Sequence, residues 1–273
     1  MFNKYLKGLI CISVLFVIAI TILIAYRNWS DTYANSVPVL MYHNVIDSDS
    51  MKKYAEEPYA DIFITIEKFE KQMKFLKDNN YKTLTLDELY QFIQGSKKLP
   101  ARSVLITFDD GRKNVYVNAY PILKKYNMKA VIFLITSKNT AQTEDYIPMG
   151  MQYLSKEEIE KGKDVFEYAS HTHNMHKREK GTNKPYLAVK SKEEIKKDIK
   201  ESLQYTEKLY FAYPYGSYKN VDTSIFKELG IKAAFITKKG KVYKGDSIYK
   251  LKRNGVSETT SEQTFKKILG YKN

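Results

Sequence analysis

The sequence predicts an α/β fold in which a parallel sheet is covered by helices. Apolar runs of strand length alternate with segments of helical periodicity along most of the 273 residues. Hydrophobic residues make up 43% of the chain and charged residues 28%, which is typical of a globular domain. Continuous apolar strands indicate a parallel sheet that is buried on both faces. An open doubly wound sheet and a closed barrel both fit this alternation, and a barrel commonly takes about 250 residues.

The elements follow one another in a regular order after a short polar stretch, 27–36, which we assign to a linker. Apolar runs predict strands at 37–42, 103–108, 130–136, 165–170, 209–213 and 233–237. Helical periodicity predicts helices at 66–79, 87–93, 115–126 and 222–229. Ser155 with Glu158, and Ser191 with Glu194, form capping boxes that predict two further helix starts. Residues 177–190 are polar and predict a long loop, and residues 37–273 as a whole predict one domain.

The N-terminus carries an uncharged apolar stretch from residue 8 to residue 26. A helix of this length spans about 28 Å, close to the hydrocarbon thickness of a bilayer. Lys4 and Lys7 precede it and favour a cytoplasmic location for residues 1–7. We therefore predict a single-pass anchor at 8–26, with residues 37–273 outside the cell. A cleaved signal peptide, giving a secreted form, is the alternative, although no small-residue cleavage site follows the stretch.

The net charge of +14 raises the question of nucleic-acid binding. Lysines are spread over the chain and interleaved with glutamates, and no basic helix or zinc-finger spacing emerges. This pattern predicts a solvated lysine-rich surface and no nucleic-acid partner. The single cysteine, Cys11, lies in the apolar stretch, and a domain of this size folds without disulfides.

Residues with catalytic chemistry gather at the ends of predicted strands. The four histidines are His43, His171, His173 and His176, and each falls at or just after a strand end. Asp109 and Asp110 follow the strand 103–108. In parallel α/β folds this edge carries the active site, and two imidazoles with one carboxylate suit a catalytic Zn²⁺. A helix-capping turn and an exposed histidine loop are the alternatives, but neither explains why both groups occupy corresponding strand ends.

Four motifs together resemble the polysaccharide deacetylases of the NodB-homology class, carbohydrate esterase family 4. They are PVLMYHNV at 38–45, TFDDG at 107–111, SHTHNMH at 170–176 and FAYPYG at 211–216. The early histidine motif is similar to the branch that de-N-acetylates poly-β-1,6-N-acetylglucosamine, and the resemblance covers about 37–256. It implies a distorted (β/α) barrel of about seven strands. It also implies an enzyme that hydrolyses N-acetyl groups with a metal, giving acetate and a free amine.

The resemblance also implies roles for individual residues. The matching positions are Asp110, His171 and His176 for the metal, Asp109 for the catalytic base, His43 for the general acid and Tyr215 for the backbone N–H that holds the oxyanion. His173 has no matching role, and we expect it to line the pocket or support the ligands. Many relatives orient the base with an arginine at the position of Ala212, so Arg253 and Arg112 are the candidates to replace it.

The metal, the substrate and the partners stay open at this level. Zn²⁺ is the default, and Co²⁺, Ni²⁺ or Fe²⁺ suits the same ligands. Poly-β-1,6-N-acetylglucosamine is the first expectation, but peptidoglycan or an O-acetylated polysaccharide would use an identical metal site. A non-catalytic wall- or matrix-binding protein is the alternative of another class, and the complete set of motifs argues against it. Expected partners are the polysaccharide, the membrane and the machinery of polymer synthesis and export.

Overall fold

The computed structural model describes residues 14–22, 32–54, 60–148 and 150–271. Its main sheet runs in the order β10-β1-β5-β6-β7-β8-β9, with β11 beside β1 and β4 beside β5, and β2 and β3 form a separate pair. The strands are β1 (Ser36–Tyr42), β2 (Asn44–Ile46), β3 (Phe63–Thr65), β4 (Lys82–Thr83), β5 (Ser103–Phe108), β6 (Ala130–Leu134), β7 (Phe166–Ser170), β8 (Lys208–Ala212), β9 (Ala233–Phe235), β10 (Lys241–Tyr243) and β11 (Asn254–Gly255).

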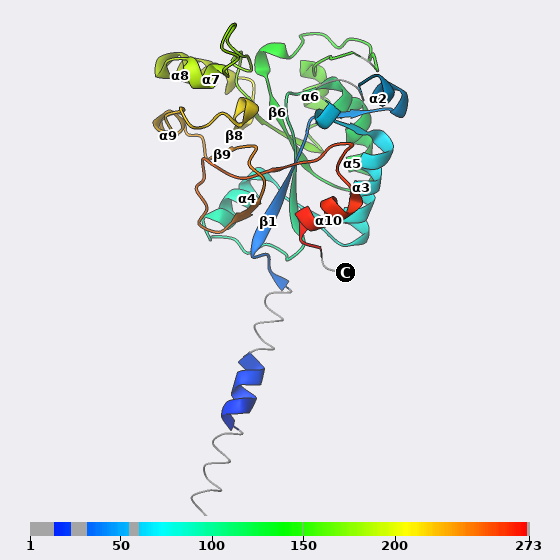
Figure 1. The fold of residues 1–273 in the computed structure, drawn as a ribbon, viewed down its shortest axis with the longest axis vertical. Helices are drawn as coiled ribbons and strands as arrows, with labels where there is room; N and C mark the ends of the chain where they lie inside the picture. The colour runs from blue at the N-terminus through cyan, green and yellow to red at the C-terminus, as the bar shows by residue number, and fades with distance from the viewer. Residues whose placement is uncertain (1–13, 23–31, 55–59, 149, 272–273) are drawn as a thin grey trace, which may run out of the picture.

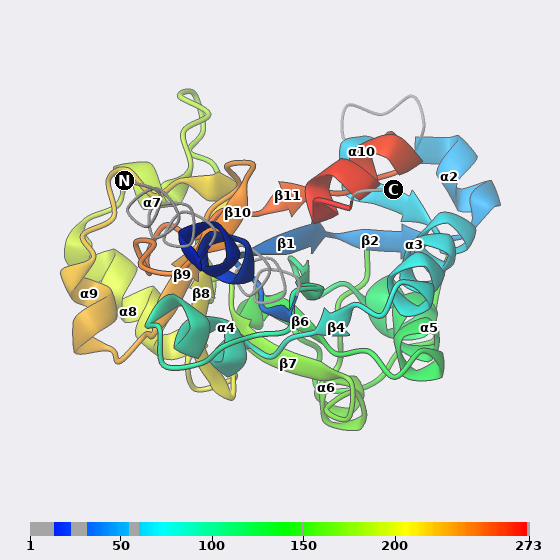
Figure 2. The ribbon, with the colours of Figure 1, turned by 90° about the horizontal axis from the view of Figure 1, so that it is seen from below.

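Helices cover the sheet on both sides. They are α2 (Ser48–Tyr54), α3 (Ile66–Asp78), α4 (Leu86–Ile93), α5 (Tyr120–Lys125), α6 (Lys156–Lys161), α7 (Tyr186–Val189), α8 (Lys192–Ser202), α9 (Ser224–Glu228) and α10 (Glu262–Leu269). In both ribbon views, α3, α5 and α10 lie to one side of the sheet and α8 and α9 to the other (Figures 1 and 2). A π-helical stretch, Val115–Ala119, precedes α5.

The sheet curls until its edges are joined by one segment, 251–255. Leu251 pairs with Phe235 at the end of β9 in a parallel bridge. Three residues further, β11 pairs with β1, so that Leu40 stands opposite Asn254. The seven-strand path is thus curled into a half-barrel. The predicted parallel sheet and its approximate strand number are confirmed, and the one antiparallel strand on this path, β10 beside β1, adds to them.

Successive side chains of a strand point to opposite faces of the sheet, so neighbouring residues of one strand belong to different hydrophobic clusters. Leu40, Ile106 and Ile132 pack outward with residues of α3, α5 and α10. Val39 and Leu105 point into the curl, where they join apolar residues of α4, β8 and β9. Both faces are buried, which is why the strands read as continuous apolar runs.

Most predicted elements are present, and their ends shift by at most two residues. The capping boxes are confirmed: the hydroxyl of Ser155 accepts from the N–H of Glu158 at 3.1 Å, and that of Ser191 from Glu194 at 3.2 Å. Two boundaries differ. The predicted loop 177–190 ends in α7, and residues 32–34 of the predicted linker hydrogen-bond to residues 99–101, which joins them to the domain.

Part of the predicted membrane span is described. Residues 14–22 form a helix whose apolar side chains, such as Leu15 and Phe16, are exposed, and the rest of the stretch 8–26 lies outside the described residues. No helix in the described ranges has the length and hydropathy needed to cross a bilayer.

Candidate active site

The carboxyl ends of four strands surround one cleft of about 800 Å³. Each strand contributes residues immediately after its last hydrogen-bonded position, where the chain turns away from the sheet. The cleft is lined by His43 after β1, Asp109 and Asp110 after β5, His171 and His176 after β7, and Tyr215 after β8. The four motifs, which are far apart in sequence, therefore meet at one edge of the sheet.

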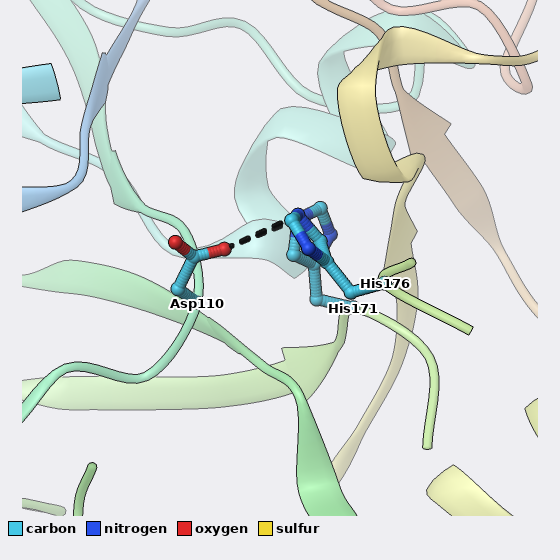
Figure 3. A group of neighbouring side chains, drawn as sticks. All are labelled: Asp110, His171 and His176. Atoms are coloured by element: carbon cyan, nitrogen blue, oxygen red, sulfur yellow. Dashed lines mark ion pairs between the residues drawn. The ribbon is translucent and has the colours of Figure 1, made fainter. Parts of the chain in front are cut away.

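Asp110, His171 and His176 form a compact group. One ligand atom from each residue lies within 4.8 Å of the other two. The Asp110 Oδ1 atom is 3.7 Å from Nε2 of His171 and 3.4 Å from Nε2 of His176. Figure 3 shows the carboxylate facing both imidazole rings. Two imidazoles and one carboxylate at this spacing are the donor set of a catalytic zinc-type site.

The environment of the group fits a metal ion. Oδ1 of Asp110 is buried and has no hydrogen-bond partner within the described chain, although buried polar atoms are normally paired. Nδ1 of His171 lies 2.7 Å from the carbonyl oxygen of Ala212, so this nitrogen donates and leaves Nε2 free to coordinate. Burial lowers the pKa of His171 to about 4 and also lowers the pKa of His176. Both rings are therefore neutral near pH 7, as ligation requires.

Backbone geometry helps to aim these side chains. Asp110 has φ 76° and Thr172, next to His171, has φ 75°, values that side-chain-bearing residues rarely adopt. Left-handed residues cost free energy and persist where the surrounding structure holds them. Gly111 continues the turn at φ 74°, and a Cβ there would approach Leu134 Cδ2 to 2.7 Å. Glycine at this point of the Asp-Asp-Gly motif therefore has a steric cause.

Asp109 forms a buried ion pair with Arg253. The guanidinium Nη1 and Nη2 atoms donate to the two carboxylate oxygens at 2.6 and 2.7 Å. Arg253 is fully buried and also donates from Nε to the carbonyl of Ile236 at 3.2 Å. Burial raises the pKa of Asp109, but the charge and hydrogen bonds of Arg253, together with the nearby His171 and His43, hold that pKa well below its usual range. Of the two sequence candidates, the structure brings Arg253 to this carboxylate.

His43 and Tyr215 also line the cleft. His43 Nε2 is 4.0 Å from Oδ2 of Asp109, and its side chain keeps 21% of its surface exposed. Tyr215 has a left-handed backbone, with φ 57°, and its ring packs 4.4 Å from that of His176. An imidazole that is partly open to solvent can exchange protons with a ligand in the cleft.

Arg112 pairs with Asp110, one of the three candidate metal ligands, and not with Asp109. Its Nη2 atom is 3.5 Å from Oδ2 of Asp110, and its guanidinium lies 4.3 Å over the ring of Tyr153. Nη1 donates to the carbonyl of Met151 at 3.2 Å. Arg112 thus engages the Asp110 oxygen that is turned away from the histidines.

We expected His173 to line the pocket or support the ligands, but it belongs neither to the lining of this cleft nor to the group of Asp110, His171 and His176. Its Nδ1 lies 2.9 Å from Oγ1 of Thr136, and its Nε2 lies 3.2 Å from Glu201. The ring stacks on Tyr205 at 5.7 Å. The left-handed backbone of Thr172, with φ 75°, breaks the extended path between His171 and His173, and the His173 ring faces another surface.

Sequence reasoning missed several residues of the cleft. Met41, Phe63, Met151, Arg178 and Thr237 also line it. Met41 could have been predicted, because it is the second-last residue of β1 and lies two residues before His43. The others come from loops or from a three-residue strand, whose paths no periodicity reveals.

Comparison with known proteins defines the class of this protein. The family profile described as polysaccharide deacetylase matches residues 96–234, and the chain belongs to that family. It is therefore an enzyme of the de-N-acetylase type. The poly-β-1,6-N-acetyl-D-glucosamine N-deacetylase of Staphylococcus aureus (strain MRSA252) is 31% identical over 248 residues, which cover 87% of this chain and 84% of that protein.

Solved structures agree. The Streptococcus pyogenes deacetylase PplD in complex with acetate has a TM-score of 0.72 and 25% identity, covering 86% of this chain and 98% of that one. IcaB from Ammonifex degensii has a TM-score of 0.70 at 24% identity over 87% of this chain and 97% of that one, a likeness in fold.

Proposed function

We propose that this chain removes N-acetyl groups from poly-β-1,6-N-acetylglucosamine outside the cell, releasing acetate and leaving free amines on the polymer. One observation carries the proposal: Asp109, paired with the buried Arg253, lines the same cleft as the group of Asp110, His171 and His176. The 31% identity to a deacetylase named for this polymer supports the substrate. The similar PplD structure was determined with acetate, the small product of such a reaction.

We further propose that Asp110, His171 and His176 hold a divalent ion, with Zn²⁺ as the default and Co²⁺, Ni²⁺ or Fe²⁺ as ions that suit the same donors. The unpartnered Oδ1 of Asp110 and the neutral imidazoles support this assignment. Such an ion would polarise the acetamide carbonyl and acidify a water molecule.

The protein's own residues would divide the remaining work. Asp109, kept ionised by Arg253, takes the proton of the attacking water as the oxygen–carbon bond forms. The Tyr215 N–H donates to the carbonyl oxygen as negative charge develops on it. His43 then donates a proton to the nitrogen as the carbon–nitrogen bond breaks, because an amide nitrogen leaves poorly unless it is protonated.

The test uses the full-length chain in detergent, stripped of metal and then supplied with Zn²⁺ or Co²⁺. It is incubated with β-1,6-linked N-acetylglucosamine oligomers and, separately, with peptidoglycan fragments. Acetate release and the loss of an acetyl mass report the reaction. Asp109→Asn and His176→Gln should abolish it. His173→Gln is the matched control, because that ring lies outside the metal group, and it should keep the activity.

The outcomes separate the parts of the proposal. Metal-dependent deacetylation of the oligomers supports reaction and substrate together. Activity confined to peptidoglycan would overturn the substrate and keep the reaction. A protein that binds metal but deacetylates neither substrate would contradict the proposal as a whole.

We also propose that residues 8–26 anchor the chain in the cell membrane, with 1–7 inside and 37–273 outside, beside the machinery that makes and exports the polymer. The uncharged run and the exposed apolar side chains of 14–22 support this. Protease added to intact cells should digest the catalytic domain without lysing the cells. A shortened, soluble form in the medium would favour cleavage after the apolar stretch.

A further inference from the structure

A second cavity of about 500 Å³ shares no lining residue with the catalytic cleft. It lies against α6 and β7, near the segment that follows β6 and the loop that leads into β8. The lining residues that matter here are Thr136, Asn139, Ile159, Tyr168, Tyr205 and Thr206. None of them belongs to the four deacetylase motifs.

Three residues of this lining carry a buried polar atom that has no partner in the described chain. The Tyr168 hydroxyl, Asn139 Oδ1 and Thr206 Oγ1 have no hydrogen-bond partner among the described residues. Tyr168 is only 1% exposed. Native proteins satisfy nearly all such atoms, with other residues, water or a ligand. The catalytic cleft also holds unpartnered atoms, on Asp110 and Arg112, so the two cavities share the feature that marks a ligand position.

The wall combines apolar faces with hydrogen-bonding groups. Tyr205, 45% exposed, and the partly buried Ile159 present surfaces on which the C–H face of a sugar ring can pack. Burial raises the pKa of the Tyr168 hydroxyl, which therefore stays protonated and able to donate. Asn139 Oδ1 can only accept, and the Thr206 hydroxyl can do either. These are the complementary groups that ring hydroxyls and an acetamide require.

The charges around the cavity favour a neutral ligand. Lys163 forms ion pairs with Glu160, at 2.6 Å, and with Glu207, and with Lys156 the lining holds two lysines and two glutamates, so its formal charges balance. Lys156 is the lining cation that has no acidic partner among the described residues, and its ammonium group adds a donor. An uncharged polyhydroxylated ring meets no unpaired carboxylate in this lining.

His173, the histidine without a role in the catalytic motif, connects this cavity to the metal-binding loop. Its ring contacts Thr136 and Tyr205, both of which line the cavity. Its backbone lies between His171 and His176 in sequence. A ligand held against Tyr205 would therefore rest on the segment that carries two candidate metal ligands.

We propose that this cavity binds a pyranose unit of the polysaccharide at a site separate from the one where the acetyl group is removed. The inference goes beyond the proposed function and requires only that the polymer be built of N-acetylhexosamine. A polymer held at two places dissociates more slowly than one held at a single place, because the second contact is intramolecular.

The test measures binding of a β-1,6-linked N-acetylglucosamine tetramer and of free N-acetylglucosamine by titration calorimetry. The full-length protein carries Asp110→Asn, so that the ligand stays acetylated. Two classes of site are expected, and adding Tyr168→Phe should weaken one at least about fivefold, the effect of losing a hydrogen bond to the ligand. Tyr213→Phe is the matched control, because that buried hydroxyl donates to the carbonyl of Tyr249 outside the cavity. It should leave both affinities unchanged.

Folding does not confound this test. Tyr168→Phe removes an atom that has no protein partner in the described chain, so the melting temperature should hold or rise. A single class of site, or two affinities that are unaffected by Tyr168→Phe, would overturn the inference and mean that the cavity holds only water.

The failure of the proposed function would look different. Wild-type turnover of the same tetramer, with no binding that depends on Tyr168, rejects the second site alone. If the tetramer is not deacetylated, binding of free N-acetylglucosamine that weakens in Tyr168→Phe still supports the site, because the monosaccharide carries no linkage.

Discussion

Replacing Arg253 by methionine tests the buried pair at the centre of the site. Both partners are inaccessible: Arg253 is 0% exposed and Asp109 is 2% exposed. The substitution keeps most of the side-chain volume but removes two donors at 2.6 and 2.7 Å from Asp109, and a third at 3.2 Å from the Ile236 carbonyl. A carboxylate would then remain buried without its cation.

The expected cost is large. Removing one partner of a buried ion pair destabilises a protein by about 3–5 kcal/mol. In a domain of this size each kcal/mol corresponds to about 2–4 °C, so the melting temperature of Arg253→Met should fall by about 6–20 °C. Arg102→Met is the matched control: that arginine is exposed and donates to the Asn79 carbonyl at 2.8 Å. It should change stability by no more than about 0.5 kcal/mol.

Thermal unfolding of a double variant distinguishes the cost of the unpaired Asp109 charge from the cost of lost packing. Adding Asp109→Asn to Arg253→Met removes the unpaired charge, so it should restore part of the stability that the first change removes. A loss below about 1 kcal/mol in Arg253→Met, or no recovery in the double variant, would refute the reasoning. Because Arg253 holds the pKa of Asp109 down against burial, its loss should raise that pKa. As the pH is lowered, the deacetylation rate of the variant should therefore begin to fall at a higher pH than that of the wild type.

Three further predictions concern the metal group. Asp110→Asn should reduce bound metal from about one ion per chain to near zero by atomic emission, and lower kcat/KM at least about 100-fold. Gly111→Ala should lower the free energy of unfolding by about 1–3 kcal/mol, because φ is +74° and the new Cβ would meet Leu134. Gly181→Ala is the control: φ is +86° there but nothing lies within 4 Å of the new Cβ, so it should lower that free energy less. The pKa of His171 is lowered to about 4, so the unfolded chain binds more protons between that pH and 6.5. Metal-free protein should therefore lose about 3 kcal/mol as pH falls through this window, and His171→Asn should flatten the loss; an unchanged slope would contradict it.

Long periodic elements were predictable because burial imposes a pattern on them. β5 spans Ser103–Phe108, as its apolar run indicated, and the helix starting after Ser155 follows its capping box. Strands of two or three residues, such as β4, β10 and β11, hold too few positions to show any period. Their pairing is set by contacts with β1 and β5 that are distant in sequence.

The site was predictable where chemistry follows a strand end directly. Asp110 and His171 stand one or two residues beyond β5 and β7, so the parallel sheet alone brings them to one edge. The position of His173 could not be predicted in this way. Its direction depends on the local backbone, with Thr172 at φ 75°, and on its partners Thr136 and Glu201.

The partner of Asp109 shows how sheet closure and site assembly depend on one another. Arg253 lies 144 residues from Asp109, in the segment that joins the edges of the half-barrel. Leu251 pairs with β9 and Asn254 pairs with β1, so Lys252 and Arg253 span the distance between these two strands, and Arg253 also reaches Thr107 of β5. Ala212, on β8, has no side chain that could reach the carboxylate, and its carbonyl instead binds His171. The segment 251–255 therefore brings the guanidinium to Asp109, and a chain in which this segment fails to dock would lose both the pairing of β11 with β1 and the cation that keeps Asp109 ionised.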